Sequence, residues 1–177
     1  THTGAQTAVI GISGGLDSTL ALLVTLDVFF SLNMPIRNII SVNMPGYGTS
    51  DITLDNARKL CNLLGTNYKE IDIRKACDQH FRDIEHDQKI HDRTYENVQA
   101  RERTQILMDI ANKANGLVIG TGDLSEIALG WCTFNGDHMS MYHVNCGVPK
   151  TLIRYLIQWF ADSSDRSISS VLTEILN

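Results

Sequence analysis

The chain has 177 residues, of which 43% are hydrophobic and 20% charged, so it can fold around one core without metal or disulfide support. Its 15 lysines and arginines against 20 acidic residues give a net charge of −5, which excludes a globally basic surface for nucleic acid. No apolar run is long enough to span a bilayer and no signal pattern opens the sequence, so we expect a cytoplasmic protein without a membrane or nucleic-acid partner.

Short apolar runs alternate with longer amphipathic stretches, which predicts parallel strands separated by helices. The fold class expected is α/β, an open, mostly parallel sheet with helices on both faces. In such sheets ligands bind beyond the carboxyl ends of the strands. Strands are predicted at residues 8–12, 39–44, 68–73 and 117–120, and helices at 18–31, 51–64, 94–115, 123–129, 151–161 and 167–176.

Two other features of the sequence carry expectations of their own. The polar, His-rich segment 74–93 is expected to be partly helical and mobile. The four cysteines, which have no metal-ligand spacing, are predicted to be free thiols of a reducing compartment: Cys61, Cys77, Cys132 and Cys146.

The sharpest motif lies between the first strand and the first helix. Two adjacent glycines allow a tight turn that presents bare N–H groups, and two serines and the helix N-terminus add further attraction for an anion. The motif predicts a phosphate-binding loop rather than a Walker loop, because it has no lysine. The alternative is a glycine turn that only caps a helix. The loop residues are Gly11, Ile12, Ser13, Gly14, Gly15, Leu16, Asp17 and Ser18.

Asp17 gives this loop an unusual charge, since a carboxylate beside a bound pyrophosphate would repel it. A divalent cation between the two groups removes that repulsion, and carboxylate oxygens are ligands that Mg²⁺ prefers. The sequence therefore predicts Asp17 as a ligand of Mg²⁺.

Residues 13–18, Ser-Gly-Gly-Leu-Asp-Ser, resemble the pyrophosphate loop of the N-type ATP pyrophosphatases. These enzymes cleave ATP between the α- and β-phosphates and adenylate an acceptor oxygen. Segments 95–101, 120–126, 130–133 and 147–152, in this order and spacing, resemble the synthetase domain of the NAD synthetases, above all the long, glutamine-dependent bacterial form. The resemblance covers most of the chain.

This resemblance implies an adenine nucleotide alpha hydrolase-like (Rossmann-like) fold across residues 1–177. It implies ATP-dependent amidation of deamido-NAD (nicotinic acid adenine dinucleotide) to NAD through an adenylated carboxylate, with release of AMP and pyrophosphate. ATP is then a co-substrate, Mg²⁺ the cofactor, and ammonia or glutamine the source of nitrogen.

Two residues of the long predicted helix, Asn97 and Arg101, are four positions apart and share one face. They could donate to phosphate or amide groups, or they could belong to a solvated face. The resemblance implies that Asn97 contacts deamido-NAD and that Arg101 lies in the substrate region. Arg103, two positions further on, is expected to be solvated.

Thr121 closes the fourth predicted strand, where the ligand crevice should lie, so its hydroxyl is expected to reach ATP. Asp123 and Glu126 have capping-box spacing, and we assign Asp123 to the helix cap. The resemblance implies that Glu126 lies near Mg²⁺ and deamido-NAD, although it could serve the helix alone.

The segment at residues 131–134 is assigned to the site by the resemblance. The segment Trp131, Cys132, Thr133 and Phe134 matches the part of the family that lines the nicotinate end, where an aromatic ring can stack on the pyridine ring, although core packing would explain Trp131 alone.

Three further residues receive separate roles. Met44 ends the second strand, and the segment Met44-Pro45-Gly46 lies where the family contacts adenine, although a simple strand-ending turn explains it nearly as well. Lys150 is a cation at a helix start, where the dipole disfavours it, which supports a phosphate contact with ATP. Asp137 is a candidate proton acceptor for the incoming ammonia on position alone.

The glutaminase domain that precedes the synthetase in the family does not occur in this sequence, so we expect a truncated synthetase domain that uses free ammonia. The resemblance implies a homo-oligomer. Two alternatives stay open: another N-type ATP pyrophosphatase such as a tRNA-modifying enzyme, and a non-catalytic nucleotide-binding module. The first would need a basic RNA-binding surface or a catalytic cysteine pair, and the second would have little use for Asp17 and Glu126 together.

Overall fold

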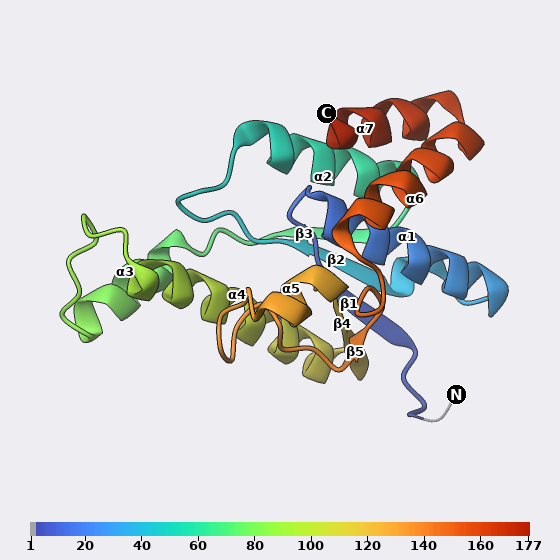
Figure 1. Ribbon diagram of the computed structural model, residues 1–177. Coiled ribbons are helices and arrows are strands. Elements are labelled where there is room, and N and C mark those ends of the chain that lie inside the picture. The colour runs from blue at the N-terminus through green and yellow to red at the C-terminus, as the bar shows by residue number, and fades with distance from the viewer. Residues whose placement is uncertain (1–2) are drawn as a thin grey trace.

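A computed structural model describes residues 3–177 and shows a five-stranded sheet in the order β3-β2-β1-β4-β5 (Figure 1). Each neighbouring pair of strands is parallel, which confirms the predicted α/β class. The strands are β1 (Thr7–Gly11), β2 (Ile39–Asn43), β3 (Asn67–Glu70), β4 (Gly116–Gly120) and β5 (Tyr142–His143). The helices are α1 (Leu16–Ser31), η1 (Ile36–Asn38, a 3₁₀ turn), α2 (Asp51–Leu64), α3 (Arg74–Asp83), α4 (Arg93–Lys113), α5 (Leu124–Leu129), α6 (Lys150–Ser163) and α7 (Arg166–Leu176).

Alternation along β1 builds a core on each face of the sheet. Ala8 and Ile10 belong to a cluster with the buried sides of α1, α2, α6 and α7. Val9, between them, belongs to a second cluster with α3 and α4. Because successive side chains of a strand point to opposite faces, one buried strand supports both layers. Figure 1 shows α4 on the opposite side of the sheet from α1 and α6.

Two local features of α2 agree with the sequence. The Ser50 side chain caps the helix by accepting a hydrogen bond from the backbone N–H of Thr53. Gly65 ends the helix in the left-handed conformation, with φ of 73°, which glycine adopts without steric cost. The cap residues therefore fix both ends of this helix.

The sheet differs from the prediction at two strands. The strand expected at 68–73 ends at Glu70, because β2 runs into Pro45, which has no N–H to continue the ladder. The pairing of β5 with β4 is a strand that the sequence did not predict, since two residues are too short to show a pattern. The polar segment 74–93 contains the ten-residue helix α3, as the expectation of partial helix required.

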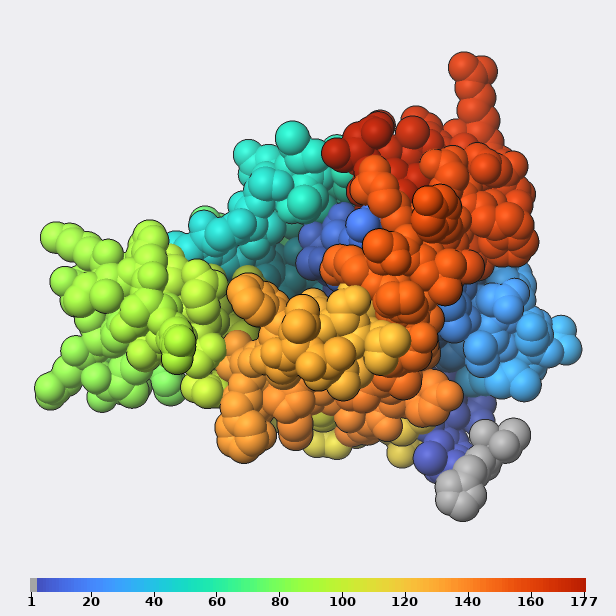
Figure 2. Space-filling model, viewed as in Figure 1, coloured from blue at the N-terminus to red at the C-terminus, as the bar shows by residue number. Residues whose placement is uncertain are grey.

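Within residues 3–177, no helix is both long enough and apolar enough to cross a membrane. All four cysteines are free thiols, as predicted. The carboxyl ends of the strands open on one side of the molecule. In Figure 2 the blue turn after β1 lies recessed there, between the teal part of α2 and the orange segment that carries α5.

Candidate active site

A cavity of about 1050 Å³ lies at the carboxyl ends of β1, β2 and β4, where the sequence placed the ligand crevice. Its other walls are one face of α4 and the segment that follows α5. Among the predicted site residues, those that line the cavity are Gly11, Ile12, Ser13, Asp17, Ser18, Met44, Asn97, Thr121, Glu126, Trp131, Cys132, Thr133, Phe134 and Asp137. Those outside its lining are Gly14, Gly15, Leu16, Arg101 and Lys150.

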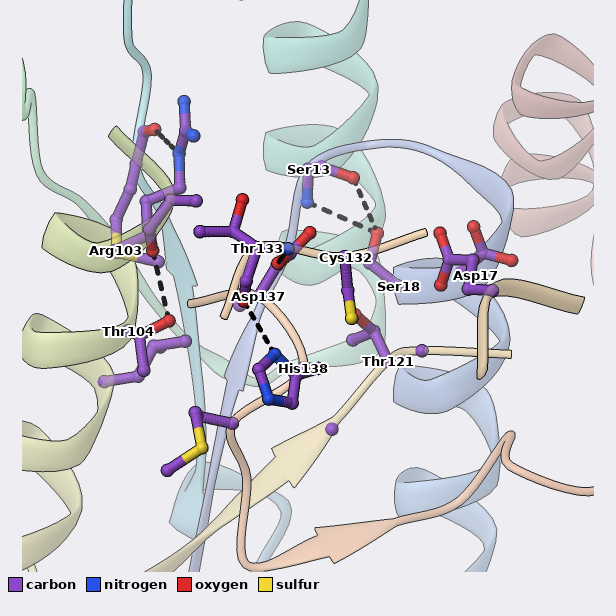
Figure 3. Close-up of a pocket in the computed structure, with 18 of the residues that line it drawn as sticks. Ser13, Asp17, Ser18, Arg103, Thr104, Thr121, Cys132, Thr133, Asp137 and His138 are labelled. Atoms are coloured by element: carbon purple, nitrogen blue, oxygen red, sulfur yellow. Dashed lines mark hydrogen bonds between the residues drawn. The ribbon is translucent and has the colours of Figure 1, made fainter. Parts of the chain in front are cut away.

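The turn after β1 presents its polar atoms to the cavity. Ser13 Oγ and Ser18 Oγ lie 3.1 Å apart, and Ser13 Oγ also accepts from the backbone N–H of Gly15 at 3.1 Å. Helix α1 begins here without a side-chain cap, so its first N–H groups have no side-chain acceptor. An uncapped helix N-terminus with two hydroxyls beside it is suited to an anion. Figure 3 shows Ser13, Ser18 and Asp17 together on this side of the cavity.

Gly14 holds this turn against α2. Its φ is +85°, in the left-handed region that favours glycine. A Cβ at this position would lie 2.1 Å from the carbonyl oxygen of Thr53, so no side chain fits without moving the backbone of α2. The two requirements together explain a glycine at the centre of the loop.

Charged groups from three helices meet beside the turn. The Lys150 ammonium donates a hydrogen bond to an Asp17 carboxylate oxygen and lies 3.6 Å from Asp123 Oδ2. Asp17 Oδ1 and Asp123 Oδ2 are buried and have no hydrogen-bond partner among residues 3–177. Burial opposes the charge of Lys150, but contact with Asp17 and the nearby acids outweighs it, so the pKa of Lys150 is raised.

The spacing of Asp123 and Glu126 forms the predicted capping box at α5. The Asp123 side chain accepts from Glu126 N at 2.8 Å, and Glu126 Oε2 accepts from Asp123 N at 3.2 Å. Burial, together with the charges of Asp17 and Asp123, raises the pKa of Glu126. Glu126 thus caps the helix with one oxygen and still lines the cavity, so its two predicted roles are compatible.

The donor set is suited to Mg²⁺. The cavity is lined by four carboxylates, on Asp17, Glu96, Glu126 and Asp137, and by two guanidinium groups, on Arg93 and Arg103. Residues 3–177 contain no group of three or more metal-ligating side chains. Mg²⁺ is commonly held by one or two carboxylates that share it with substrate phosphates, so an acidic cavity with the unpartnered Asp17 Oδ1 fits this ion.

The two predicted α4 residues hold the loop that covers the cavity. Asn97 Oδ1 accepts from the Thr133 hydroxyl at 2.8 Å, and the Arg101 Nε–H donates to the Phe134 carbonyl at 3.0 Å. Asp137 accepts from Thr133 N at 2.6 Å, which closes the loop on itself. Arg101 therefore contacts the outside of the site, while Asn97 and Asp137 line it.

Trp131 is not a core residue, because its side chain is 77% exposed at the mouth of the cavity. Phe134 is 74% exposed and lines the same wall. Both aromatic rings are thus free to meet a flat ligand, and packing in the core does not explain either of them.

Arg103 corrects an expectation, since it is half-buried rather than part of a solvated face. Its Nε–H donates to the Met44 carbonyl at 3.1 Å, across the cavity from the turn after β1 (Figure 3). Burial lowers the pKa of its guanidinium. Next to it, Gln99 Oε1 accepts from Tyr47 N at 3.1 Å. The sequence analysis gave no role to Gln99 and expected Arg103 to be solvated, because the spacing of residues on one helix does not show which loop they contact.

Asn145 is a second residue that the sequence analysis missed. It is fully buried beside the turn after β1, and it donates to the carbonyl of Asp17 at 2.9 Å. It follows the two-residue strand β5, so no pattern in the sequence marked it as part of the site.

Comparisons with known proteins point to one family. Residues 1–170 match the family model described as NAD synthase. The glutamine-dependent NAD(+) synthetase of Mycobacterium leprae is 44% identical over 176 residues, which cover 96% of this chain and 26% of the relative. The chain thus spans about a quarter of the length of such curated relatives.

Solved structures give the same result for the fold. The glutamine-dependent NAD+ synthetase of Acinetobacter baumannii, in complex with ADP, matches with a TM-score of 0.86 and 28% identity, over 97% of this chain and 32% of that one. The NMN synthetase of Francisella tularensis matches with a TM-score of 0.77 over 99% of this chain and 66% of its own, and at 23% identity it shows a shared fold.

Proposed function

Because this chain belongs to the NAD synthase family, we propose that it catalyses the ATP-dependent amidation of deamido-NAD to NAD. The observation that carries the proposal is the turn at residues 13–18, which opens into the cavity between an uncapped helix N-terminus and the carboxylates of Asp17 and Glu126. The ADP complex of the Acinetobacter baumannii relative supports the binding of an adenine nucleotide.

The first step activates a carboxylate that does not react with ammonia by itself. An oxygen of the nicotinate carboxylate forms a bond to the α-phosphorus of ATP, and the bond from that phosphorus to the bridging oxygen breaks. Pyrophosphate leaves with the bonding electron pair and is received by the N–H groups and hydroxyls of the turn at residues 13–18. Mg²⁺ held by Asp17 and Glu126 would neutralise charge on the departing phosphates.

In the second step ammonia attacks the carbonyl carbon of the mixed anhydride, and AMP leaves with the electron pair of the broken C–O bond. The nitrogen must lose a proton, and Asp137, which lines the cavity and is exposed, is the proposed acceptor. The exposed rings of Trp131 and Phe134 would hold the pyridine ring nearby. Asn97 would contact deamido-NAD directly, while Arg101 keeps the covering loop in place.

The remaining contacts concern ATP. We place adenine against Met44, the ATP hydroxyls or phosphates near Thr121, and the polyphosphate near Lys150, whose ammonium already lies at Asp17. The acidic lining explains why the polyphosphate would enter together with a divalent cation.

We further propose that the chain works in the cytoplasm, in a homo-oligomer, and that a glutaminase domain supplies ammonia where it is joined to the chain. The tRNA-modifying alternative is disfavoured because the net charge is −5 and no basic surface is implied. A non-catalytic nucleotide-binding module would not need two carboxylates at the phosphate end.

The direct test is incubation of the protein with ATP, Mg²⁺, ammonium and deamido-NAD, and separation of the products by chromatography. We expect AMP and NAD in equal amounts, and no AMP when deamido-NAD is omitted. AMP release that depends on tRNA instead would support the alternative pyrophosphatase.

A variant tests the role of the turn. Asp17→Ala should lower kcat for amidation by at least about 100-fold, because it removes the charge that holds the cation at the leaving group. Asp27→Ala, an exposed position on the same helix, is the matched control and should keep full activity. Full activity of a folded Asp17→Ala protein would contradict the metal-ligand role.

A further inference from the structure

Asn145 joins three turns of the chain at the edge of the cavity. Its Nδ2 group donates to the carbonyl of Asp17 at 2.9 Å and to the carbonyl of Thr121 at 3.1 Å. The Asp17 carbonyl lies in the first turn of α1, just after the turn that follows β1. The Thr121 carbonyl lies directly after β4, and Asn145 itself follows β5. One amide therefore links the segments that follow three neighbouring strands, β1, β4 and β5, at the switch point of the sheet between β1 and β4.

The amide is fully buried and only half satisfied. Both partners of Nδ2 are carbonyl oxygens, so this end of the side chain must be the NH₂ group. Its Oδ1 atom is buried with no hydrogen-bond partner among residues 3–177. A buried polar atom without a partner lowers stability, so Asn145 is a poor choice for stability alone.

The backbone after Asn145 leads directly to Lys150. Val148 N donates to the Asn145 carbonyl at 2.9 Å, and Leu124 N donates to the Val148 carbonyl at 3.1 Å. Lys150 N then donates to Ser125 Oγ at 3.2 Å. The segment is thereby tied to α5, and it delivers the Lys150 ammonium to Asp17, the residue whose backbone Asn145 also holds.

From these contacts we propose that Asn145 is a positioning residue for the ATP end of the site. It fixes the separation of the Asp17 and Thr121 turns and seats the segment that carries Lys150. The inference rests on the proposed function, because it assigns these turns to one ATP molecule. Misplacing a polyphosphate contact by about 1 Å can lower the rate about 100-fold, so a link of this kind has a large effect on activity.

The test is the substitution Asn145→Leu, which keeps the branched shape and removes the donor. We expect kcat/KM for ATP to fall by about 100-fold through both kcat and KM, and KM for ammonium to change by less than about twofold. Calorimetry with ATP and Mg²⁺ should show weaker binding in the absence of deamido-NAD. Asn145→Ser, which has a shorter donor, is measured beside it.

Thr25→Val is the matched control, because Thr25 is buried in the same helix as Asp17 and its hydroxyl donates to the Ala21 carbonyl at 2.7 Å. Thr25→Val should lower the melting temperature about as much as the Asn145 substitutions do, and it should leave kcat/KM for ATP unchanged. Normal ATP kinetics in both Asn145 variants, an equal loss in the control, or failure of both variants to fold would overturn the proposal. If the unsubstituted protein forms no AMP with deamido-NAD, the proposed function fails instead.

Discussion

Three charged side chains at the edge of the cavity come from three different helices, and the position of Lys150 is explained by the acidic residues around it. Asp17 lies in the first turn of α1, Glu126 in α5, and Lys150 at the start of α6. Lys150 lies where the dipole of its own helix disfavours a cation, and contact with Asp17 compensates for this misfit. Two acids around one lysine leave negative charge that a divalent cation can use.

Replacing Glu126 by glutamine should raise the stability of the protein and lower its activity. Burial raises the pKa of the Glu126 carboxyl, so ionising it lowers the stability of the folded state. Its favourable contribution is present below the carboxyl pKa of the unfolded chain, about 4.3, and is lost as pH rises through the higher folded-state pKa. Glu126→Gln, which keeps an oxygen for the cap, should therefore melt at a higher temperature than the unsubstituted protein at pH 8.

This advantage should shrink as the pH falls from 8 through the raised folded-state pKa toward the unfolded-chain value of about 4.3, as measured by thermal unfolding. Amidation by the same variant should fall by about 100-fold or more, because the amide carries no charge for the cation. Glu174→Gln, an exposed position on α7, serves as the control and should show neither effect. A difference in melting temperature that does not vary with pH would contradict the burial of the Glu126 charge.

The loop after β1 works together with a neighbouring helix, because Gly14 packs against the backbone of α2. Its left-handed φ was foreseeable from the pair of glycines, and so were the Ser50 and Gly65 ends of α2. The contact of Gly14 with Thr53 was not, since nothing local in the sequence says which helix lies above the turn.

Gly14→Ala should therefore be more costly than a glycine replacement that meets conformational strain alone. At Gly65, where φ is 73° and no atom lies within 4 Å of a Cβ, alanine should cost about 1–2 kcal/mol. At Gly14 the clash with Thr53 adds to that cost, and ATP binding should weaken as the turn shifts. Urea unfolding of the two variants measures the comparison, and equal midpoints would contradict the close approach to α2.

Hydrophobic periodicity and cap residues predicted most helices and strands. They did not predict very short strands or the second role of a helix that both packs on the sheet and lines the cavity. Strand β5 has two residues, and β3 ended early because of Pro45 in the neighbouring chain segment. Helix α4 packs on the sheet and also forms a wall of the cavity, so Arg103 was read as solvated when it contacts Met44. Such contacts depend on which elements become neighbours, and the amphipathic pattern of one helix does not contain that information.

At the scale of the molecule, the strand order explains why distant segments form one site. The order β3-β2-β1-β4-β5 brings the segments after β1 and β4 side by side, with Asp17 in the first turn of α1 and Thr121 directly after β4. The alternation of strands and helices in the sequence predicted a parallel sheet and the crevice at its carboxyl ends, but not strand β5. The sequence pattern could not predict the contact of Asn145 with Asp17, because these two residues are 128 positions apart along the chain and meet only in the folded protein.

The central chemical claim is that the nicotinate carboxylate attacks the α-phosphorus of ATP. It can be measured with deamido-NAD that carries ¹⁸O in both oxygens of that carboxylate, followed by mass spectrometry of the AMP. The proposed mechanism predicts one ¹⁸O atom in the phosphate of each AMP and one in the amide of each NAD. Unlabelled AMP formed alongside NAD would show that the carboxylate is not adenylated and would contradict it.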